Sequence, residues 1–129
     1  ACKDAGAKRA MPLPVSVPSH CALMKPAADQ LAETLNATSF HAAEMPVINN
    51  VDVAMETAPE QIREALIRQL YSPVRWVETI QALKEQGVSH VYECGPGKVL
   101  SGLIKRIDRD IAARPLENGE AFEAALKGE

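Results

Sequence analysis

Short apolar runs alternate with longer amphipathic segments along most of this chain, and this alternation constrains the fold more than any other feature. Apolar runs at residues 46–50, 88–93 and 111–116 are typical of strands, and the segments around them have the apolar spacing of helices. Because a helix between two strands produces a parallel crossover, the pattern predicts an α/β sheet covered by helices. Only about three strands are visible, few for an independent parallel sheet, so we expect the chain to be part of something larger.

Prolines and glycines mark where the expected helices begin and end. Residues 1–6 are expected to end a helix at Gly6, and the prolines that follow leave at most an edge strand and then an extended loop. Further helices are expected from Leu23 with Pro26 in the first turn, after Pro59, after an N-cap at Ser72, after Gly95-Pro-Gly97, and around Phe122 and Leu126. The residues predicted to face inward are Leu23, Ala27, Leu31, Leu35, Ile62, Leu66, Leu70, Val74, Val77, Ile80, Leu83, Val99, Leu100, Leu103, Ile104 and Ile107.

Charge and composition exclude several classes of function. The 129 residues carry a formal net charge of −3 and are 4% aromatic, so neither a basic field nor stacking platforms exist for nucleic acid. No apolar run approaches the ~20 residues that span a bilayer, and residues 1–9 hold no signal-peptide pattern. Three widely spaced cysteines fit reduced thiols. We therefore expect a soluble cytoplasmic protein, and, because the chain does not begin with Met, a residue 1 that is not a natural start.

His20 is the first candidate for chemistry. It follows a proline-rich segment and stands at the expected start of a helix, where the helix dipole opposes protonation and keeps the imidazole able to accept a proton. A general base needs this property, but a lone histidine is also often a solvent-facing cap, so both interpretations stay open. The adjacent Cys21 is interpreted as a small, partly buried thiol, because sequence neighbours are badly placed to form a nucleophile and base pair. His41 and His90 lack ligand-spaced partners, so no metal site is predicted.

The Gly95-Pro-Gly-Lys98 turn invites comparison with a phosphate-binding loop, because amide groups at a helix start attract anions. The nucleotide pattern fails, since such a loop needs glycine at position 92 and Ser or Thr at position 99, where the chain has Tyr92 and Val99. A tight turn that lets the backbone pass close to another element is favoured. The acidic residues form no close pair for glycosidase chemistry, and the basic pairs are interpreted as solvated surface.

Four separated segments nevertheless form a recognisable set. They are Pro12-Leu-Pro-Val-Ser-Val-Pro-Ser-His-Cys-Ala-Leu-Met24, Pro46-Val-Ile-Asn-Asn-Val51, Arg68-Gln-Leu-Tyr-Ser-Pro-Val-Arg-Trp76 and Tyr92-Glu-Cys-Gly-Pro-Gly-Lys-Val-Leu100. In this order and spacing they closely resemble the C-terminal part of the bacterial malonyl-CoA:acyl carrier protein transacylase family. The resemblance covers nearly the whole chain, and it implies a Ser-His acyltransferase that moves malonyl from coenzyme A to the phosphopantetheine thiol of acyl carrier protein through an acyl-serine intermediate. It implies no cofactor, since the coenzyme A thioester is a substrate.

The same resemblance implies a fold and catalytic residues. Residues 1–17 would end a ferredoxin-like small subdomain, and residues 18–129 would form the C-terminal part of an α/β-hydrolase-like large subdomain. His20 matches the family's catalytic base, which takes the proton from the serine and later from the incoming thiol. Gln69 matches the residue whose main-chain carbonyl holds the other imidazole nitrogen, a role that Asp fills in hydrolase triads.

Further positions are implied for substrate and partner. Ser19 and Val99 would line the substrate pocket, whereas Lys8 and Arg106 resemble positions that meet the acidic carrier protein, where charge helps encounter and register. Many relatives have an aromatic residue at the position of Ser19, so the smaller side chain leaves open how strictly α-branched malonyl groups are rejected.

One departure from the family pattern bears on activity. The Gly-x-Ser-x-Gly nucleophile elbow, the arginine that pairs with the malonyl carboxylate and the Gly-Gln-Gly segment are all absent from these residues. We therefore expect the isolated chain to be inactive and the full-length protein to be an active monomer. Two alternatives stay open at this point: a non-catalytic module that docks acyl carrier protein, and a segment of a polyketide-synthase acyltransferase domain.

Overall fold

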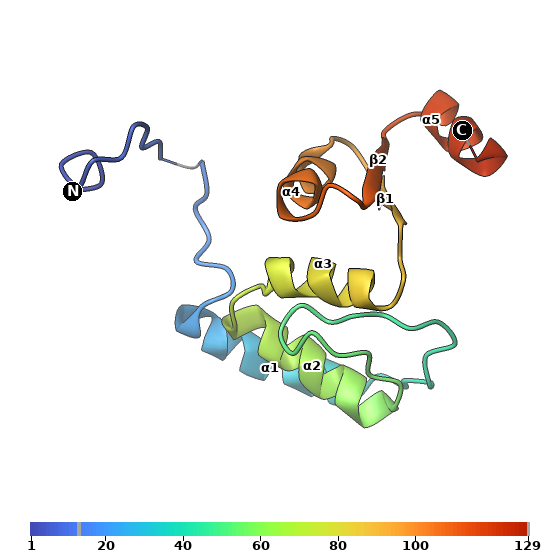
Figure 1. The fold of residues 1–129 in the computed structure, drawn as a ribbon. Coiled ribbons are helices and arrows are strands. Elements are labelled where there is room, and N and C mark those ends of the chain that lie inside the picture. The colour runs from blue at the N-terminus through green and yellow to red at the C-terminus, as the bar shows by residue number, and fades with distance from the viewer. Residues whose placement is uncertain (13, 129) are drawn as a thin grey trace.

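The computed structural model describes residues 1–12 and 14–128; Leu13, in the first of the four segments, and Glu129 lie outside the described residues. The elements in chain order are a 3-10 turn η1 (Ala22–Met24), α1 (Lys25–Asn36), α2 (Pro59–Tyr71), α3 (Trp76–Glu85), β1 (His90–Cys94), α4 (Val99–Ile107), β2 (Ala112–Leu116) and α5 (Gly119–Lys127). Figure 1 shows α1 and α2 side by side, α3 between this pair and α4, and the N-terminal segment leading away from the helices.

The sheet consists of β1 and β2, which pair in parallel from His90 opposite Ala112 to Cys94 opposite Leu116. Helix α4 is the crossover between them and packs on both strands, while α5 packs on β2 and α3 on α4. The core lies where these elements meet, and its buried members are Ile80, Ile104, Ile111 and Ala113. Helices combined with a parallel strand pair confirm the predicted α/β class.

Helices α1 and α2 form an antiparallel pair that is held at both ends. At one end the Lys25 ammonium lies 4.7 Å from the centroid of the Tyr71 ring, a cation-π contact between the start of α1 and the last residue of α2. At the other end the Arg63 Nε donates a hydrogen bond to the main-chain oxygen of Leu35 at 3.0 Å. The buried residue of each helix is an alanine. The segment that precedes α1 is thereby held beside the C-terminal end of α2.

The turn residues identified in the sequence act largely as expected. Pro26 and Pro59 lie in the first turns of α1 and α2. Gly87 follows α3 with a φ of 82°, and its N–H donates to the oxygen of Lys84 at 2.9 Å. The strands begin one or two residues later than predicted. None of the helices in the described ranges is long and apolar enough to cross a membrane.

Two local predictions are wrong. Residues 46–50 form no strand and make only a single antiparallel bridge, between Ile48 and Met55, because an asparagine-centred turn reverses the chain there. Ser72 does not begin a helix: it ends α2 with extended angles (φ −112°, ψ 149°), since a residue before proline avoids the helical region. The first residues form one helical turn that ends at Gly6 (φ 89°), where the N–H groups of Gly6 and Ala7 donate to the oxygens of Lys3 and Cys2, the pattern of a helix end stopped by glycine that the sequence predicts.

Several side chains predicted to face inward are exposed instead. Leu23 is 74% exposed because it lies in η1, where a repeat of three residues per turn takes it off the buried face of α1. The others are Leu66 in α2, Val74 in the connection before α3, Val77 in α3, and Val99, Leu100 and Leu103 in α4. A strand pair with few helices leaves these side chains uncovered, so the chain exposes more apolar side chains than its core buries.

Core packing gives a first prediction about stability. Ile104 is 1% exposed, whereas Leu126 in α5 is 74% exposed. We expect Ile104→Ala to lower the free energy of unfolding by about 2–5 kcal/mol through lost burial and a residual cavity. Leu126→Ala is the matched control and should change it by less than about 0.5 kcal/mol. Urea unfolding measures both, and equal losses from the two variants would show that the core is placed wrongly.

Candidate active site

His20 lies against the C-terminal end of α2 and is held there by two contacts. Its main-chain N–H donates to the oxygen of Leu70 at 3.1 Å, and its Nδ1 lies 2.9 Å from the main-chain oxygen of Gln69. The last carbonyl groups of an α-helix have no partner within the helix. The end of α2 therefore offers free oxygen atoms, one of which holds the backbone of His20 and the other its ring.

This contact decides which ring nitrogen is available for chemistry. A carbonyl oxygen only accepts hydrogen bonds, so Nδ1 must carry the hydrogen. In the neutral imidazole, Nε2 then presents its lone pair, as a general base requires. His20 is exposed in this chain, so its ring is accessible to a group outside the helix pair. The arrangement can accept a proton at Nε2 while a peptide oxygen keeps the ring in one orientation.

The backbone at His20 is unusual. Its φ of 59° lies in the left-handed region, which residues other than glycine rarely adopt and which often marks functional positions. The preceding turn is tied by the N–H of Ser19, which donates to the oxygen of Val17 at 2.8 Å. The Cys21 thiol donates to the oxygen of Pro18 at 3.2 Å, so it contacts a carbonyl and not the imidazole. The sharp turn thus separates Cys21 from the ring of its neighbour.

A cavity of about 340 Å³ lies between α2 and the loop that precedes it. Gln69 belongs to its wall, so the residue that holds the His20 ring through its carbonyl also lines this space. Most of the remaining wall is apolar, and its polar members besides Gln69 are Asn49, Asn50 and Glu56.

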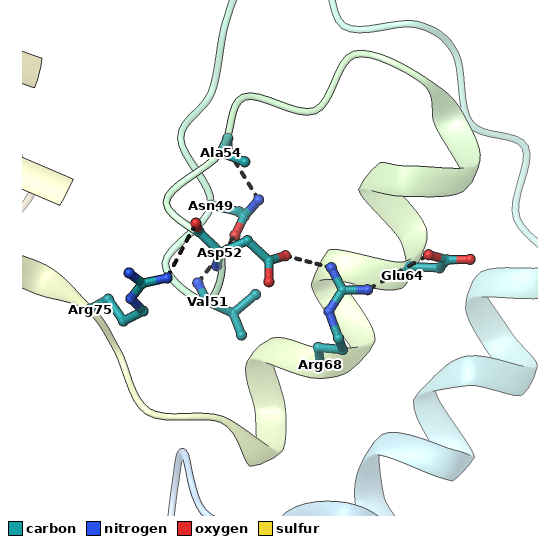
Figure 2. A network of polar contacts seen from close by, with 7 residues as sticks. All are labelled: Asn49, Val51, Asp52, Ala54, Glu64, Arg68 and Arg75. Atoms are coloured by element: carbon teal, nitrogen blue, oxygen red, sulfur yellow. Dashed lines mark hydrogen bonds and ion pairs between the residues drawn. The ribbon is translucent and has the colours of Figure 1, made fainter. Parts of the chain in front are cut away.

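The loop over this cavity is fixed by an asparagine side chain (Figure 2). The Oδ1 of Asn49 accepts the N–H groups of Val51 and Asp52, at 3.2 and 2.7 Å, and its Nδ2 donates to the oxygen of Ala54 at 3.1 Å. Val53, inside this turn, has a φ of 57°, which is strained for a β-branched residue.

Two arginines tie the same loop to neighbouring elements. Arg68 of α2 contacts the carboxylate of Asp52 at 2.5 Å and that of Glu64 at 3.6 Å. The hydrogen bond with Asp52 is the main cause that raises the pKa of the Arg68 guanidinium. Arg75 donates to the main-chain oxygen of Asp52 at 3.4 Å and pairs with Glu78 at 2.7 Å. Sequence reasoning missed this network, although its Asn-Asn-Val-Asp run is a turn signal.

The turn between β1 and α4 is built around a carboxylate of the chain itself. Glu93 accepts the N–H groups of Leu100 and Ser101, at 3.0 and 2.7 Å, and the Ser101 hydroxyl at 2.8 Å. These bonds, led by the Ser101 N–H, lower the pKa of Glu93. Gly95 and Gly97 have φ values of 123° and 100°, which only glycine adopts easily. Because Glu93 already bonds the first amides of α4, the structure favours a structural turn over an anion site.

The other residues singled out in the sequence lie on the surface. Ser19 is exposed beside His20, and Val99, the first residue of α4, is 71% exposed. Lys8 and Arg106 are exposed as well. Within residues 1–12 and 14–128, no hydrogen bond or ion pair joins Val99, Lys8 or Arg106 to His20. Among the described residues, no three His, Cys, Asp or Glu side chains converge as a metal site.

Comparison with known proteins supplies a context for this arrangement. The malonyl CoA-acyl carrier protein transacylase of Escherichia coli strain K12 is 59% identical over 127 residues, which are 98% of this chain and 41% of that protein. The protein of the same name from Bacillus subtilis strain 168 is 48% identical over 125 residues, 97% of this chain and 39% of that protein. No protein-family model matches the chain.

Solved structures agree with these relatives. An acyl carrier protein S-malonyltransferase from Vibrio cholerae superposes with a TM-score of 0.90 at 59% identity, over 96% of this chain and 40% of that one. A malonyl transacylase solved in complex with its type II polyketide-synthase acyl carrier protein gives a TM-score of 0.94 at 55% identity, over 99% of this chain and 41% of that one.

The fold is therefore that of an acyltransferase, of which this chain has the C-terminal α/β portion. The chain is similar to the C-terminal part of the malonyl CoA-acyl carrier protein transacylases and spans about 41% of the length of the relatives it matches. This confirms the resemblance seen in the four sequence segments.

The cap on α4 gives a prediction about pH. The lowered pKa of Glu93 means that its carboxylate stabilises the folded chain above the ordinary value of 4.5, and that this contribution disappears as pH falls through the lowered value. We expect Glu93→Gln to reduce the loss of stability between about pH 6 and about pH 3, a range that brackets the ordinary carboxyl pKa. Thermal unfolding across this range measures the effect. The exposed Glu117→Gln is the control, and an identical pH dependence in both variants would contradict the assignment.

Proposed function

We propose that this chain is the part of a malonyl-CoA:acyl carrier protein S-malonyltransferase that supplies the general base, His20, oriented by the main-chain oxygen of Gln69. The observation that carries the proposal is the 2.9 Å contact between Nδ1 of His20 and that oxygen. The names of the relatives support malonyl transfer to acyl carrier protein as the reaction of the whole protein. In this proposal the nucleophilic serine lies outside these residues, and the isolated chain is inactive.

The proposed reaction has two transfers that use the same nitrogen. Nε2 of His20 accepts the proton of the serine hydroxyl as the oxygen attacks the malonyl thioester carbonyl, and the imidazolium then gives this proton to the departing coenzyme A sulfur. In the second transfer Nε2 accepts the proton of the phosphopantetheine thiol, whose sulfur attacks the acyl-serine ester. The proton returns to the serine oxygen as the ester bond breaks, so atoms and charge balance.

The orienting group in this proposal is a peptide oxygen and not a carboxylate. It fixes the ring and the tautomer, as the aspartate does in a Ser-His-Asp triad, but adds no full negative charge beside the imidazolium. A neutral orienting group suits transfer to a thiol, which needs less help in losing its proton than an alcohol. No cofactor is required, because the coenzyme A thioester already activates the acyl group.

The remaining assignments extend this proposal. Residues 1–17 would end a ferredoxin-like small subdomain and residues 18–129 would belong to the α/β-hydrolase-like large one. The whole protein would be a cytoplasmic monomer that binds malonyl-CoA and acyl carrier protein. Ser19 and Val99 would line the acyl pocket, and the small Ser19 side chain leaves room for an α-branched acyl group.

A chimera tests the catalytic part of the proposal. The chain would replace the matching C-terminal part of the Escherichia coli relative, to which it is 59% identical. The chimera should form a malonyl adduct with malonyl-CoA, seen by intact mass, and pass it to acyl carrier protein. His20→Ala should lower the rate of malonyl transfer by at least about 10³-fold, because triad-type residues contribute on this scale.

The exposed His41→Ala variant is the matched control and should keep the rate of the parent chimera. Far-UV circular dichroism should show that both variants are folded. Near-normal turnover of folded His20→Ala would defeat the proposal. Binding of acyl carrier protein without any malonyl adduct would instead favour a non-catalytic docking module.

The basic side chains give a separate prediction about the carrier protein. Reversing the charge in Lys8→Glu and Arg106→Glu should raise the KM for acyl carrier protein several-fold, because charge at such positions promotes encounter with an acidic partner. The KM for malonyl-CoA should stay the same. Steady-state kinetics at low and moderate salt measures both constants, with Lys127→Glu in the exposed last turn of α5 as control. An unchanged KM for the carrier would remove these two residues from the interface.

A further inference from the structure

We infer that Asp52 is a positioning residue for the histidine: through its ion pair with Arg68 it fixes the last turn of α2, and with it the carbonyl oxygens that hold His20. The inference deepens the proposed function and rests on it. Asp52 lies in the loop between α1 and α2 and touches neither His20 nor Gln69 in the hydrogen bonds of the described residues. Any effect on the base must therefore pass through Arg68.

The position of Arg68 makes this coupling direct. Arg68 immediately precedes Gln69 and Leu70, whose oxygens hold the ring and the backbone of His20. Its guanidinium extends from α2 to the Asp52 carboxylate, as Figure 2 shows. A small rotation of this last turn moves both oxygen atoms together, so whatever anchors Arg68 also sets where the imidazole stands.

The end of α2 needs such an anchor. Helix ends fray, because their last carbonyl groups lack partners within the helix. Here the chain leaves α2 in an extended conformation at Ser72, and no following helical turn supports the end. The two bonds to His20 use the free oxygens, and the contact of Lys25 with Tyr71 joins this end to α1. Arg68 joins the same turn to the loop that precedes α2.

The loop that carries Asp52 is rigid enough to serve. The Asn49 side chain accepts two hydrogen bonds and donates one within this turn, and Val53 is held in a strained left-handed conformation. On its other side, the main-chain N–H of Arg75 donates to the oxygen of Asn50 at 3.0 Å. The loop thus joins the end of α2 to the start of α3.

The ion pair between Asp52 and Arg68 should affect the reaction rate more than the stability of the fold. The side chains of Asp52 and Arg68 are each 37% exposed, and ion pairs at this exposure contribute little to stability. Orientation has a far larger leverage on rate, since a misplacement of about 1 Å in a reacting group costs up to about 10²-fold. Loss of the pair should therefore change the rate much more than the folding.

Glu64 provides a matched control within the same cluster. Its carboxylate lies 3.6 Å from the other terminal nitrogen of Arg68, but it belongs to α2 itself and is 69% exposed. Glu64→Gln therefore removes a negative charge beside Arg68 without detaching α2 from the loop.

The test measures the acylation rate of the chimera in a single turnover with malonyl-CoA. Asp52→Ala should lower the acylation rate constant about tenfold with the KM for malonyl-CoA unchanged, while Glu64→Gln stays within about twofold of the parent. Asp52→Glu should recover part of the rate. Asp52→Ala combined with Arg68→Ala should be no slower than the slower single variant, because both remove one coupling.

A second readout does not depend on activity. The ¹⁵N and ¹H NMR signals of the His20 Nδ1–H group report its hydrogen bond to Gln69, and they should shift or broaden in Asp52→Ala but not in Glu64→Gln. An inactive parent chimera would defeat the proposed function, while these signals would still test the positioning. Unchanged His20 signals, a normal acylation rate in Asp52→Ala, or rate losses that multiply in the double variant would each overturn the inference.

Discussion

The site depends on one constraint: a helix cannot satisfy the carbonyl groups of its own last turn. In α2 these oxygens are taken by a residue from a distant segment, His20, whose backbone and ring each bind one of them. The antiparallel pairing of α1 and α2 makes this possible, because it holds the start of α1 against the end of α2. The carbonyl groups left without partners at the end of α2 thereby orient the imidazole of His20.

The start of α4 is also bonded by a residue from another element, but there the bonded groups are N–H donors and not carbonyl oxygens. The first amides of α4 are bonded by Glu93 from the end of β1, so the helix start that resembles an anion site is already occupied by an internal carboxylate. In both places a helix end is completed by a residue from another element. At α4 the bonds of the Glu93 carboxylate go to the start of the helix. At α2, His20 binds through Nδ1, so its Nε2 remains available.

The sequence predicted the fold class and the order of elements because prolines and glycines mark helix ends whatever the tertiary context, as at Pro26, Pro59 and Gly87. It failed where a side chain redirected the backbone, as Asn49 does in the segment expected to be a strand. His20 was singled out through its place in a four-part resemblance, since a lone histidine indicates little, and its catalytic role stays a prediction. The Asp52 and Arg68 pair was not found, because residues 16 positions apart in a loop and a helix share no periodicity that a sequence reveals. The left-handed backbone of His20 was equally invisible, because it follows from bonds to a helix end that forms elsewhere.

The contact between His20 and Gln69 joins residues 49 positions apart. Closing a loop of this length costs chain entropy that one hydrogen bond does not offset, so the contact forms only once the two helices have already paired. In the proposed function, the base therefore becomes competent late in folding. Any variant that slows the pairing of these helices would delay the formation of this contact, and with it the proposed base, even when the final structure is unchanged.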